Sequence, residues 1–228
     1  MNAVAVVLAA GEGERLGLGP KAFLEVAGRT ILDMAIQRAA SCELISSVVV
    51  AVPAGFEEKV PRHQVTGMPV TVVPGGSSRQ ESVRRALQVV PDDAERVVCH
   101  DAARPFAAPE IFASVLEALS DADGAVPVLP IPDTVKRVED GWVTETVARG
   151  DLRVAQTPQA FVASALREAH ERAAREGRAF TDDAALVEWA GYRVRTVAGE
   201  PVNFKITTPS DLARAEAFLL EAADAEGG

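Results

Sequence analysis

The sequence predicts an α/β fold, a three-layer α/β/α sandwich around a mostly parallel central sheet. Apolar, β-rich runs alternate with helix-like stretches, which is the order expected for parallel strands joined by crossover helices. The runs 4–8 and 48–52 are apolar at nearly every residue, as in strands covered on both faces. With 228 residues, 48% of them hydrophobic, the chain can bury one substantial core, so we expect a single domain over residues 1–228.

The expected elements follow in this order along the chain. Strands are expected at 4–8, 48–52, 70–73, 97–99 and 124–129, with helices at 30–40, 82–89 and 110–119. Three further helix starts are indicated by a capping hydroxyl followed by Pro or acidic residues, at Thr157-Pro158, Thr181-Asp182-Asp183 and Thr208-Pro209. Gly191 is expected to end the second of these helices.

Residues 134–147 interrupt this alternation. Two β-rich runs flank Asp140-Gly141, a strong hairpin signal, so we expect a projecting β-arm at about 133–149. An isolated hairpin is marginally stable in water, and this one carries Trp142 and several valines. We therefore expect the arm to pack against a second copy of the chain in a homodimer; the alternative is an edge hairpin folded onto its own core. Residues 222–228 are expected to form a frayed tail.

Composition excludes several classes of protein. A net charge of −10 argues against a nucleic-acid binder, because that affinity comes largely from Lys and Arg. Cys42 and Cys99 both lie beside apolar residues, with no Cys and His at metal-ligand spacing, which favours a reduced, cytoplasmic protein. No basic residue precedes the apolar run 3–10, which we interpret as a strand and not as a signal peptide. No run approaches the roughly 20 apolar residues of a membrane span.

A glycine-rich loop follows the first expected strand. Ala9, Ala10, Gly11 and Gly13 are small, so backbone N–H groups can approach an anion closely, and Arg15 and Lys21 add positive charge. The pattern is neither a dinucleotide-binding fingerprint nor a Walker loop. The alternative is a strand-to-helix turn with solvated charges. Glu12 and Glu14 place negative charge in the same loop, which is unfavourable for a triphosphate unless these side chains turn outward.

Asp101 follows the apolar run 97–99, and ligands of open α/β sheets gather at the carboxyl ends of parallel strands. We expect it to bind Mg²⁺, which often needs only one or two protein carboxylates beside substrate phosphates. The alternative is a carboxylate that caps the turn at 102–103. The adjacent His100 is expected to be structural.

Taken together, these motifs resemble those of the 2-C-methyl-D-erythritol 4-phosphate cytidylyltransferase family. The resemblance rests on Leu-Ala-Ala-Gly-x-Gly-x-Arg at 8–15, Pro20-Lys21, Pro74-Gly75-Gly76-Ser77-Ser78-Arg79 with Ser82-Val83, His100-Asp101-Ala102-Ala103-Arg104-Pro105, Asp133-Thr134-Val135-Lys136-Arg137, Thr157-Pro158-Gln159, Thr181-Asp182-Asp183 and Asn203-Phe204-Lys205-Ile206-Thr207. It implies a fold like that of nucleotide-diphospho-sugar transferases. It also implies an enzyme that transfers CMP from CTP to 2-C-methyl-D-erythritol 4-phosphate in isoprenoid precursor synthesis, releasing 4-diphosphocytidyl-2-C-methyl-D-erythritol and pyrophosphate with the help of Mg²⁺.

The resemblance also implies roles for particular residues. Nucleotide binding is expected at Gly76, Ser77, Ser82 and Ala102, besides the glycine loop; from the residues alone, 74–77 could equally be a tight turn that opens a helix. Acceptor binding is expected at Asp101, Arg104, Thr134, Arg149, Thr157 and Thr181. Thr134 and Arg149 bracket the arm, so each site would borrow residues from a neighbouring subunit if the arm crosses a dimer interface.

The expected chemistry needs no general base. The acceptor is a phosphate monoester with a second pKa of about 6, so its attacking oxygen is largely deprotonated near neutral pH. Catalysis should then rest on positioning and on charge stabilisation by Arg15, Lys21 and Lys205. Lys205 is expected on a strand just before a helix; without the resemblance, a solvated edge lysine would be favoured.

Three alternatives remain open. One is a cytidylyltransferase for another polyol phosphate, such as ribitol 5-phosphate. Another is a non-catalytic nucleotide-binding module on the same fold. The third is a glycosyltransferase, whose Asp-x-Asp motif matches Asp121-Ala122-Asp123 in letters; we interpret that segment as a solvated helix cap.

Overall fold

The computed structural model describes residues 2–11, 13, 19–60 and 67–226, and its centre is one mixed sheet. The sheet has eight strands in the order β10-β7-β11-β6-β1-β4-β5, with β12 paired to β7. Their bounds are β1 Ala3–Leu8, β4 Ile45–Val52, β5 Val70–Pro74, β6 Arg96–Asp101, β7 Gly124–Pro130, β10 Arg153–Ala155, β11 Gln159–Val162 and β12 Val194–Ala198. The pairs β1–β4, β1–β6, β4–β5 and β12–β7 are parallel, whereas β11 runs antiparallel to β6 and β7.

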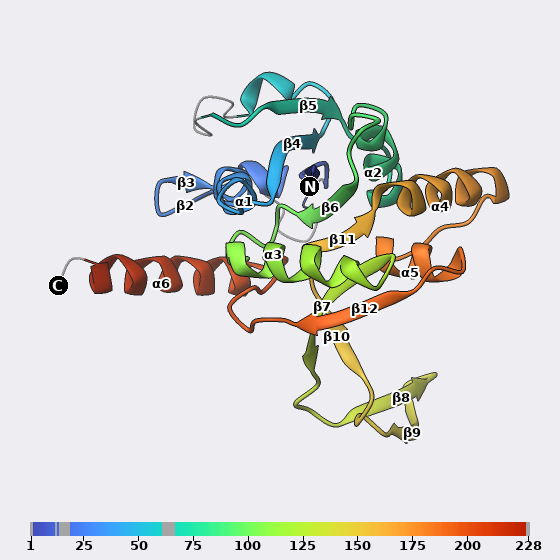
Figure 1. Cartoon of the computed structure of the whole chain (residues 1–228). Coiled ribbons are helices and arrows are strands. Elements are labelled where there is room, and N and C mark those ends of the chain that lie inside the picture. The colour runs from blue at the N-terminus through green and yellow to red at the C-terminus, as the bar shows by residue number, and fades with distance from the viewer. Residues whose placement is uncertain (1, 12, 14–18, 61–66, 227–228) are drawn as a thin grey trace.

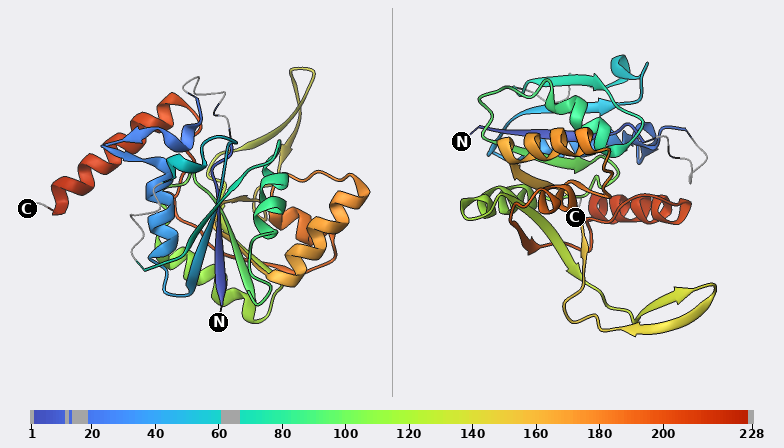
Figure 2. Two further views of the ribbon diagram at one scale, coloured as in Figure 1. Left: turned by 90° about the horizontal axis from the view of Figure 1, so that it is seen from above. Right: turned by 90° about the vertical axis from the view of Figure 1, so that its right-hand side faces the viewer.

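Helices cover both faces of this sheet, which confirms the three-layer prediction (Figure 2). One face packs against α1 Ile31–Ala40 and α3 Pro109–Glu117, and the other against α2 Arg79–Leu87, α4 Ala163–Glu176 and α5 Asp183–Trp189. Along β1 the side chains alternate between the two cores: Ala5 and Val7 join the first, and Val4 and Val6 the second. All four are fully buried, which explains why this strand is apolar at successive positions.

A third, smaller core lies beside the sheet. It joins β2 Glu25–Val26, which pairs with β3 Arg29–Thr30, and the start of α1 to the C-terminal helix α6 Pro209–Glu226. Its side chains include Phe106 and Phe218, whose ring centroids are 4.9 Å apart. Helix α6 extends away from the body of the molecule (Figure 1). It continues to Glu226, so much of the expected frayed tail is helical. Short 3-10 turns occur at η1 Lys21–Phe23, η2 Glu57–Lys59 and η3 Ala118–Ser120. Among the described helices, none combines the length and apolar character needed to cross a bilayer.

The expected hairpin is present and forms a sheet of its own. It consists of β8 Val135–Glu139 and β9 Trp142–Val147, joined through Asp140 and Gly141 with φ of 48° and 85°. Figures 1 and 2 show it standing away from the body of the molecule. Trp142 is 78% exposed and Val143 61% exposed, so the arm does not fold back onto its own core.

One expected helix start is wrong, and at a second, correctly expected start the capping residue differs. Thr157-Pro158, joined by a cis peptide bond, precedes strand β11, and helix α4 begins only at Ala163. The local signal of a hydroxyl followed by Pro is overridden there because β11 pairs with both β6 and β7. At α5 the cap is Asp182, whose side chain accepts a hydrogen bond from the Ala185 N–H at 2.9 Å, and not Thr181. Gly191, with φ of 99°, follows α5 as expected.

Candidate active site

A cleft of about 550 Å³ opens at the carboxyl ends of β1 and β6. It is lined by Leu8, Ala10, Gly11, Gly13, Lys21, Gly76, Ser77, Ser78, Arg79, Ser82, Asp101, Ala103, Lys205 and Thr207. Four segments far apart in sequence therefore meet here: the glycine loop after β1, the loop before α2, the turn after β6 and the segment before α6. Most residues expected to bind the nucleotide, and two of the three expected catalytic cations, line this cleft. The third cation, Arg15, lies outside the described residues, as do Glu12 and Glu14.

Asp101 ends β6 at the wall of the cleft, and its carboxylate has a cation on each oxygen. Arg79 Nε donates to Oδ1 at 2.9 Å, and Lys205 Nζ donates to Oδ2 at 2.5 Å. Burial alone would raise the pKa of Asp101, but the charges of Arg79 and Lys205 outweigh it and hold that pKa well below its usual range. The carboxylate is therefore ionised at any working pH.

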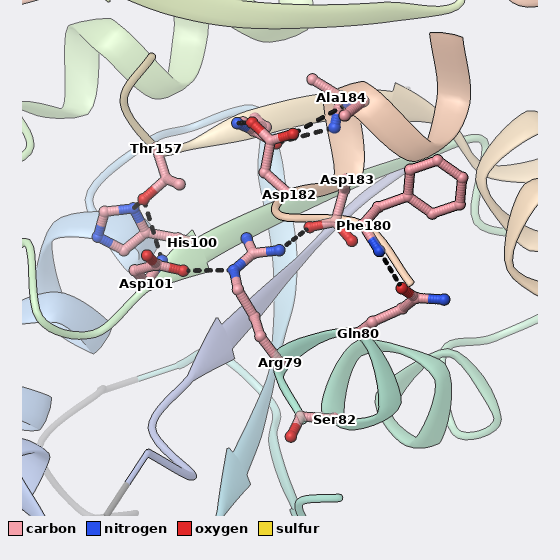
Figure 3. A network of polar contacts seen from close by, with 12 residues as sticks. Arg79, Gln80, Ser82, His100, Asp101, Thr157, Phe180, Asp182, Asp183 and Ala184 are labelled. Atoms are coloured by element: carbon pink, nitrogen blue, oxygen red, sulfur yellow. Dashed lines mark hydrogen bonds and ion pairs between the residues drawn. The ribbon is translucent and has the colours of Figure 1, made fainter. Parts of the chain in front are cut away.

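Arg79 joins two buried carboxylates, those of Asp101 and Asp183 (Figure 3). Its Nη1 donates to Asp183 Oδ2 at 2.7 Å, and His170 Nε2 lies 3.2 Å from the other oxygen of Asp183. Asp183 is 1% exposed; burial opposes its ionisation, yet Arg79 lowers the pKa to about 2. Neither the Arg79–Asp183 pair nor the role of His170 could be predicted from the sequence. An acidic residue such as Asp183 is common in the first turn of a helix and does not indicate a buried partner.

Behind Asp101, a buried chain of hydrogen bonds fixes the end of β6. The Asp101 N–H donates to Thr157 Oγ1 at 3.0 Å, and Thr157 Oγ1 lies 3.1 Å from His100 Nδ1. His100 Nε2 lies 3.1 Å from the Arg104 carbonyl oxygen, which can only accept, so the proton is on Nε2 and the Thr157 hydroxyl donates to Nδ1. Burial lowers the pKa of His100 to about 4, which keeps the ring neutral. His100 is therefore structural, as expected, and Thr157 supports Asp101 from behind instead of lining the cleft.

Lys205 is presented by an irregular segment and not by the expected strand. The Ile206 N–H donates to the Ala103 carbonyl oxygen at 2.8 Å, and buried Asn203 donates from Nδ2 to the Thr157 carbonyl oxygen at 2.9 Å. These long-range hydrogen bonds replace a strand ladder and attach residues 203–206 to the turn after β6 and to the segment before β11. Lys21 Nζ donates to the Ile206 carbonyl oxygen at 3.4 Å, so both lysines lie against this segment.

The other expected acceptor residues do not line the cleft of the same chain. Arg104 Nη1 donates to the Asn203 carbonyl oxygen at 2.8 Å. Thr134 and Arg149 are exposed at the base of the arm, and Arg149 donates to the Ile131 carbonyl oxygen at 3.1 Å. Thr181 is exposed as well.

The alanines expected in the nucleotide site are engaged with the sheet. The Ala9 N–H donates to the Ala51 carbonyl oxygen at 2.8 Å, and the Ala102 N–H donates to the Leu8 carbonyl oxygen at 3.0 Å. Both alanines are buried, so they offer no free N–H to a phosphate. Their small size still lets the neighbouring loops approach one another.

The residues present fit a single divalent cation. Within the described part of the chain no group of three His, Cys, Asp or Glu could hold a metal by itself. Asp101 is ionised at the cleft wall, and one of its oxygens is covered only by a flexible lysine. One carboxylate with water and substrate phosphates is a common ligand set for Mg²⁺.

Comparison with known proteins gives a consistent result. A family model described as 2-C-methyl-D-erythritol 4-phosphate cytidylyltransferase matches residues 3–221. Relatives with that name come from Rhodococcus jostii, 49% identical over 223 residues (96% of each chain), and Thermus thermophilus, 44% identical over 218 residues (96% of this chain and 97% of the relative). A crystal structure of the Thermus thermophilus enzyme superposes with a TM-score of 0.81 at 41% identity, covering 96% of this chain and 98% of that one. The crystal structure of 4-diphosphocytidyl-2C-methyl-D-erythritol synthase from Anaerococcus prevotii superposes with a TM-score of 0.85 at 28% identity, covering 96% of each chain.

Proposed function

The chain belongs to the 2-C-methyl-D-erythritol 4-phosphate cytidylyltransferase family, and from this premise we propose that the cleft at the ends of β1 and β6 is its active site. The reaction is transfer of CMP from CTP to 2-C-methyl-D-erythritol 4-phosphate with release of pyrophosphate, in isoprenoid synthesis. One observation supports this location: Lys21, Asp101 and Lys205 line the same cleft. Membership of this family favours the methylerythritol acceptor over ribitol 5-phosphate, and an enzyme over a non-catalytic module.

The chemistry that fits this cleft is direct displacement. An acceptor phosphate oxygen attacks the α-phosphorus of CTP, the new P–O bond forms, and the bond to the β-phosphate breaks to release pyrophosphate. No residue needs to remove a proton, because the acceptor's second pKa is about 6. Lys21 and Lys205, with Arg15 outside the described residues, hold the phosphates and stabilise negative charge as it develops.

Asp101 is the residue that would hold Mg²⁺. The ion would neutralise charge on the phosphate oxygens. Lys205 covers one oxygen of Asp101 at 2.5 Å, so its side chain would turn toward a phosphate when that oxygen takes a metal. Mn²⁺ binding in the presence of CTP, followed by electron paramagnetic resonance, should weaken in Asp101→Asn; unchanged binding would refute this assignment.

The base site would lie between the glycine loop and the start of α2. Ala10, Gly11 and Gly13 of the glycine loop line the same cleft as Gly76, Ser77 and Ser82. Ala9 and Ala102, with their N–H groups occupied, would contribute packing only.

We further propose that the arm makes the protein a homodimer with shared sites. Val138, Trp142 and Val143 are exposed on an arm that stands clear of its own body, and large exposed apolar side chains of this kind mark interaction surfaces. Thr134 and Arg149 lie at the base of that arm, outside the cleft of their own chain, where they could complete a partner's acceptor site. Two buried, unpaired cysteines favour a reducing compartment, which we propose is the cytoplasm.

The activity is tested by pyrophosphate release from each of the four ribonucleoside triphosphates, with methylerythritol phosphate or ribitol 5-phosphate as acceptor. CTP with methylerythritol phosphate should react fastest. Lys21→Ala should lower kcat by roughly 10²-fold or more, whereas Lys59→Ala, a lysine that stacks on Phe56 outside the cleft, should not change it. Preference for a purine triphosphate would refute the base site, and normal turnover of Lys21→Ala would refute the location.

Shared sites are tested by mixing two inactive variants. In a hybrid of Lys21→Ala and Arg149→Ala subunits, one of the two clefts receives Lys21 and Arg149 both intact, so activity should return after subunit exchange. Failure of hybrids to regain activity, with dimers detected by sedimentation, would contradict shared sites.

A further inference from the structure

The loop before α2 is braced by side chains from the first two turns of that helix. Glu81 Oε2 accepts from the Ser77 N–H at 2.9 Å and from the Ser77 hydroxyl at 2.7 Å, while Arg85 Nη2 donates to Glu81 Oε1 at 2.7 Å. Arg85 Nη1 also donates to the Gly75 carbonyl oxygen at 2.7 Å. The Glu81–Arg85 pair thus holds both ends of the segment 75–77.

The remaining donors of this segment are also engaged within the protein. The Gly75 N–H donates to the Val52 carbonyl oxygen at 2.7 Å, and the Gly76 N–H donates to Ser82 Oγ at 3.0 Å. Ser82 Oγ in turn donates to the Ser78 carbonyl oxygen at 2.8 Å. Every backbone N–H from residue 75 to 77, and the hydroxyls of Ser77 and Ser82, therefore point to protein acceptors.

With these donors engaged, the loop's groups that remain for a ligand are the carbonyl oxygens of Gly76 and Ser77. Gly76 and Ser77 both line the cleft, and no donor in the described part of the chain bonds to their carbonyl oxygens. A base that carries an amino group can donate to such oxygens. A base that carries a carbonyl oxygen at the same position would place its own acceptor against these acceptors, and all of them would lack a donor. Leaving polar groups unpaired in this way discriminates strongly between close analogues. Cytosine has an amino group at position 4, where uracil has an oxygen.

From this geometry we propose that Glu81 and Arg85 are positioning residues for the selection of cytosine over uracil, because they engage the donors of the loop and leave its acceptors to face the base. The inference rests on the proposed placement of the base between Gly76 and the glycine loop.

The Glu81 side chain packs tightly against the loop and stays ionised. A Cβ built on Gly76 would lie 2.4 Å from Glu81 Cγ, so the glutamate side chain occupies the space that any larger residue at 76 would need. Hydrogen bonds from the Ser77 hydroxyl and N–H, with the charge of Arg85, lower the pKa of Glu81 to about 2. Glu81 therefore accepts both Ser77 hydrogen bonds as a carboxylate, and a wild-type preference for CTP should not vary from about pH 5 to about pH 9.

The test is the ratio of kcat/KM for CTP to that for UTP, from pyrophosphate release with methylerythritol phosphate. Glu81→Gln has the same size but cannot accept from both Ser77 donors and from Arg85 together, so a donor is released toward the base. The ratio should fall about tenfold, the order expected when one hydrogen bond is set wrongly. Arg85→Met should lower it in the same direction. Glu176→Gln, which breaks a matched i,i+4 pair with Arg172 on α4, should leave it unchanged.

The outcomes separate the inference from the function it depends on. A fall in the ratio of less than about threefold in Glu81→Gln, or equal losses for both nucleotides, would make Glu81 a merely structural residue and overturn the inference. Wild-type protein inactive with CTP and methylerythritol phosphate would instead overturn the proposed function. Circular dichroism of the variants should match the wild type.

Discussion

Replacing Arg79 with Met should destabilise the protein more than any exposed charge change, because it leaves two buried carboxylates without their shared cation. Arg79 lies 2.9 Å from Asp101 and 2.7 Å from Asp183, whose side chains are 11% and 2% exposed. Breaking a buried pair by removing one partner costs about 3–5 kcal/mol. Methionine keeps much of the volume, so the loss measures charge more than cavity.

The stability of the wild type and that of Arg79→Met should change with pH in opposite directions. In the wild type Asp183 has a pKa of about 2 against 3.8 for the free group, which stabilises the fold by roughly 2–3 kcal/mol above pH 3.8 and is lost as the pH falls toward 2. Without Arg79, burial raises the folded pKa of Asp183 above the unfolded value. The variant should then lose stability as the pH rises, the reverse of the wild-type trend. Adding Asp183→Asn should recover part of the loss at neutral pH, because it removes an uncompensated charge.

The assay is urea unfolding at two pH values and one protein concentration, followed by the fluorescence of Trp189, which packs against Phe180. Arg195→Met is the control: it removes an exposed ion pair with Asp121, for which a change within about 1 kcal/mol is expected. If Arg79→Met loses less than about 1 kcal/mol and Asp183→Asn recovers nothing, the buried carboxylates do not depend on Arg79.

Two further predictions concern neighbouring parts of the site. His100 has a folded pKa of about 4 against 6.5 for the free group, so the unfolded chain takes up a proton first as the pH falls; the wild type should lose up to about 3 kcal/mol between about pH 6.5 and 4, and His100→Asn should lose less over that range by urea unfolding. A Cβ on Gly75 would lie 2.2 Å from Ala10 Cβ, so Gly75→Ala should push the two loops of the base site apart and raise KM for CTP about tenfold or more. Gly150→Ala, where a Cβ meets open space, should leave KM unchanged.

The strands predicted from sequence are those with a strong local signal. The parallel strands β1, β4 and β6 are apolar at successive positions because both faces of the sheet are covered. The arm could be predicted from the turn residues Asp140-Gly141. Strands β10, β11 and β12 were missed for different reasons. β10 has only three residues, all exposed; β11 has four residues and follows a proline; and β12 has two partly buried and three exposed residues without strict alternation. Their pairing is decided by tertiary neighbours and not by local propensity.

The same distinction applies to the site. Asp101 and Lys205 were chosen separately, from a strand end and from a resemblance, and the structure brings them to 2.5 Å across 104 positions in the sequence. The contact from Arg79 to Asp183 spans the same number of positions, and nothing in either local pattern marks it. Residues that act through their own backbone position could therefore be predicted, whereas residues that act by charge pairing across the fold could not.

The positive charge of the described cleft lining is too small to offset the negative charge of the two substrates. Its described lining carries three cations, Lys21, Arg79 and Lys205, and one carboxylate, Asp101, a net charge of +2 within a chain of net charge −10. A triphosphate and a phosphate monoester together bring about six negative charges near neutral pH. Two positive charges cannot offset six, and Arg79 already neutralises Asp183 behind the cleft. A divalent cation and Arg15 would supply three of the four positive charges still needed, and a carboxylate kept ionised by Arg79 and by the more mobile Lys205 is suited to receive such an ion.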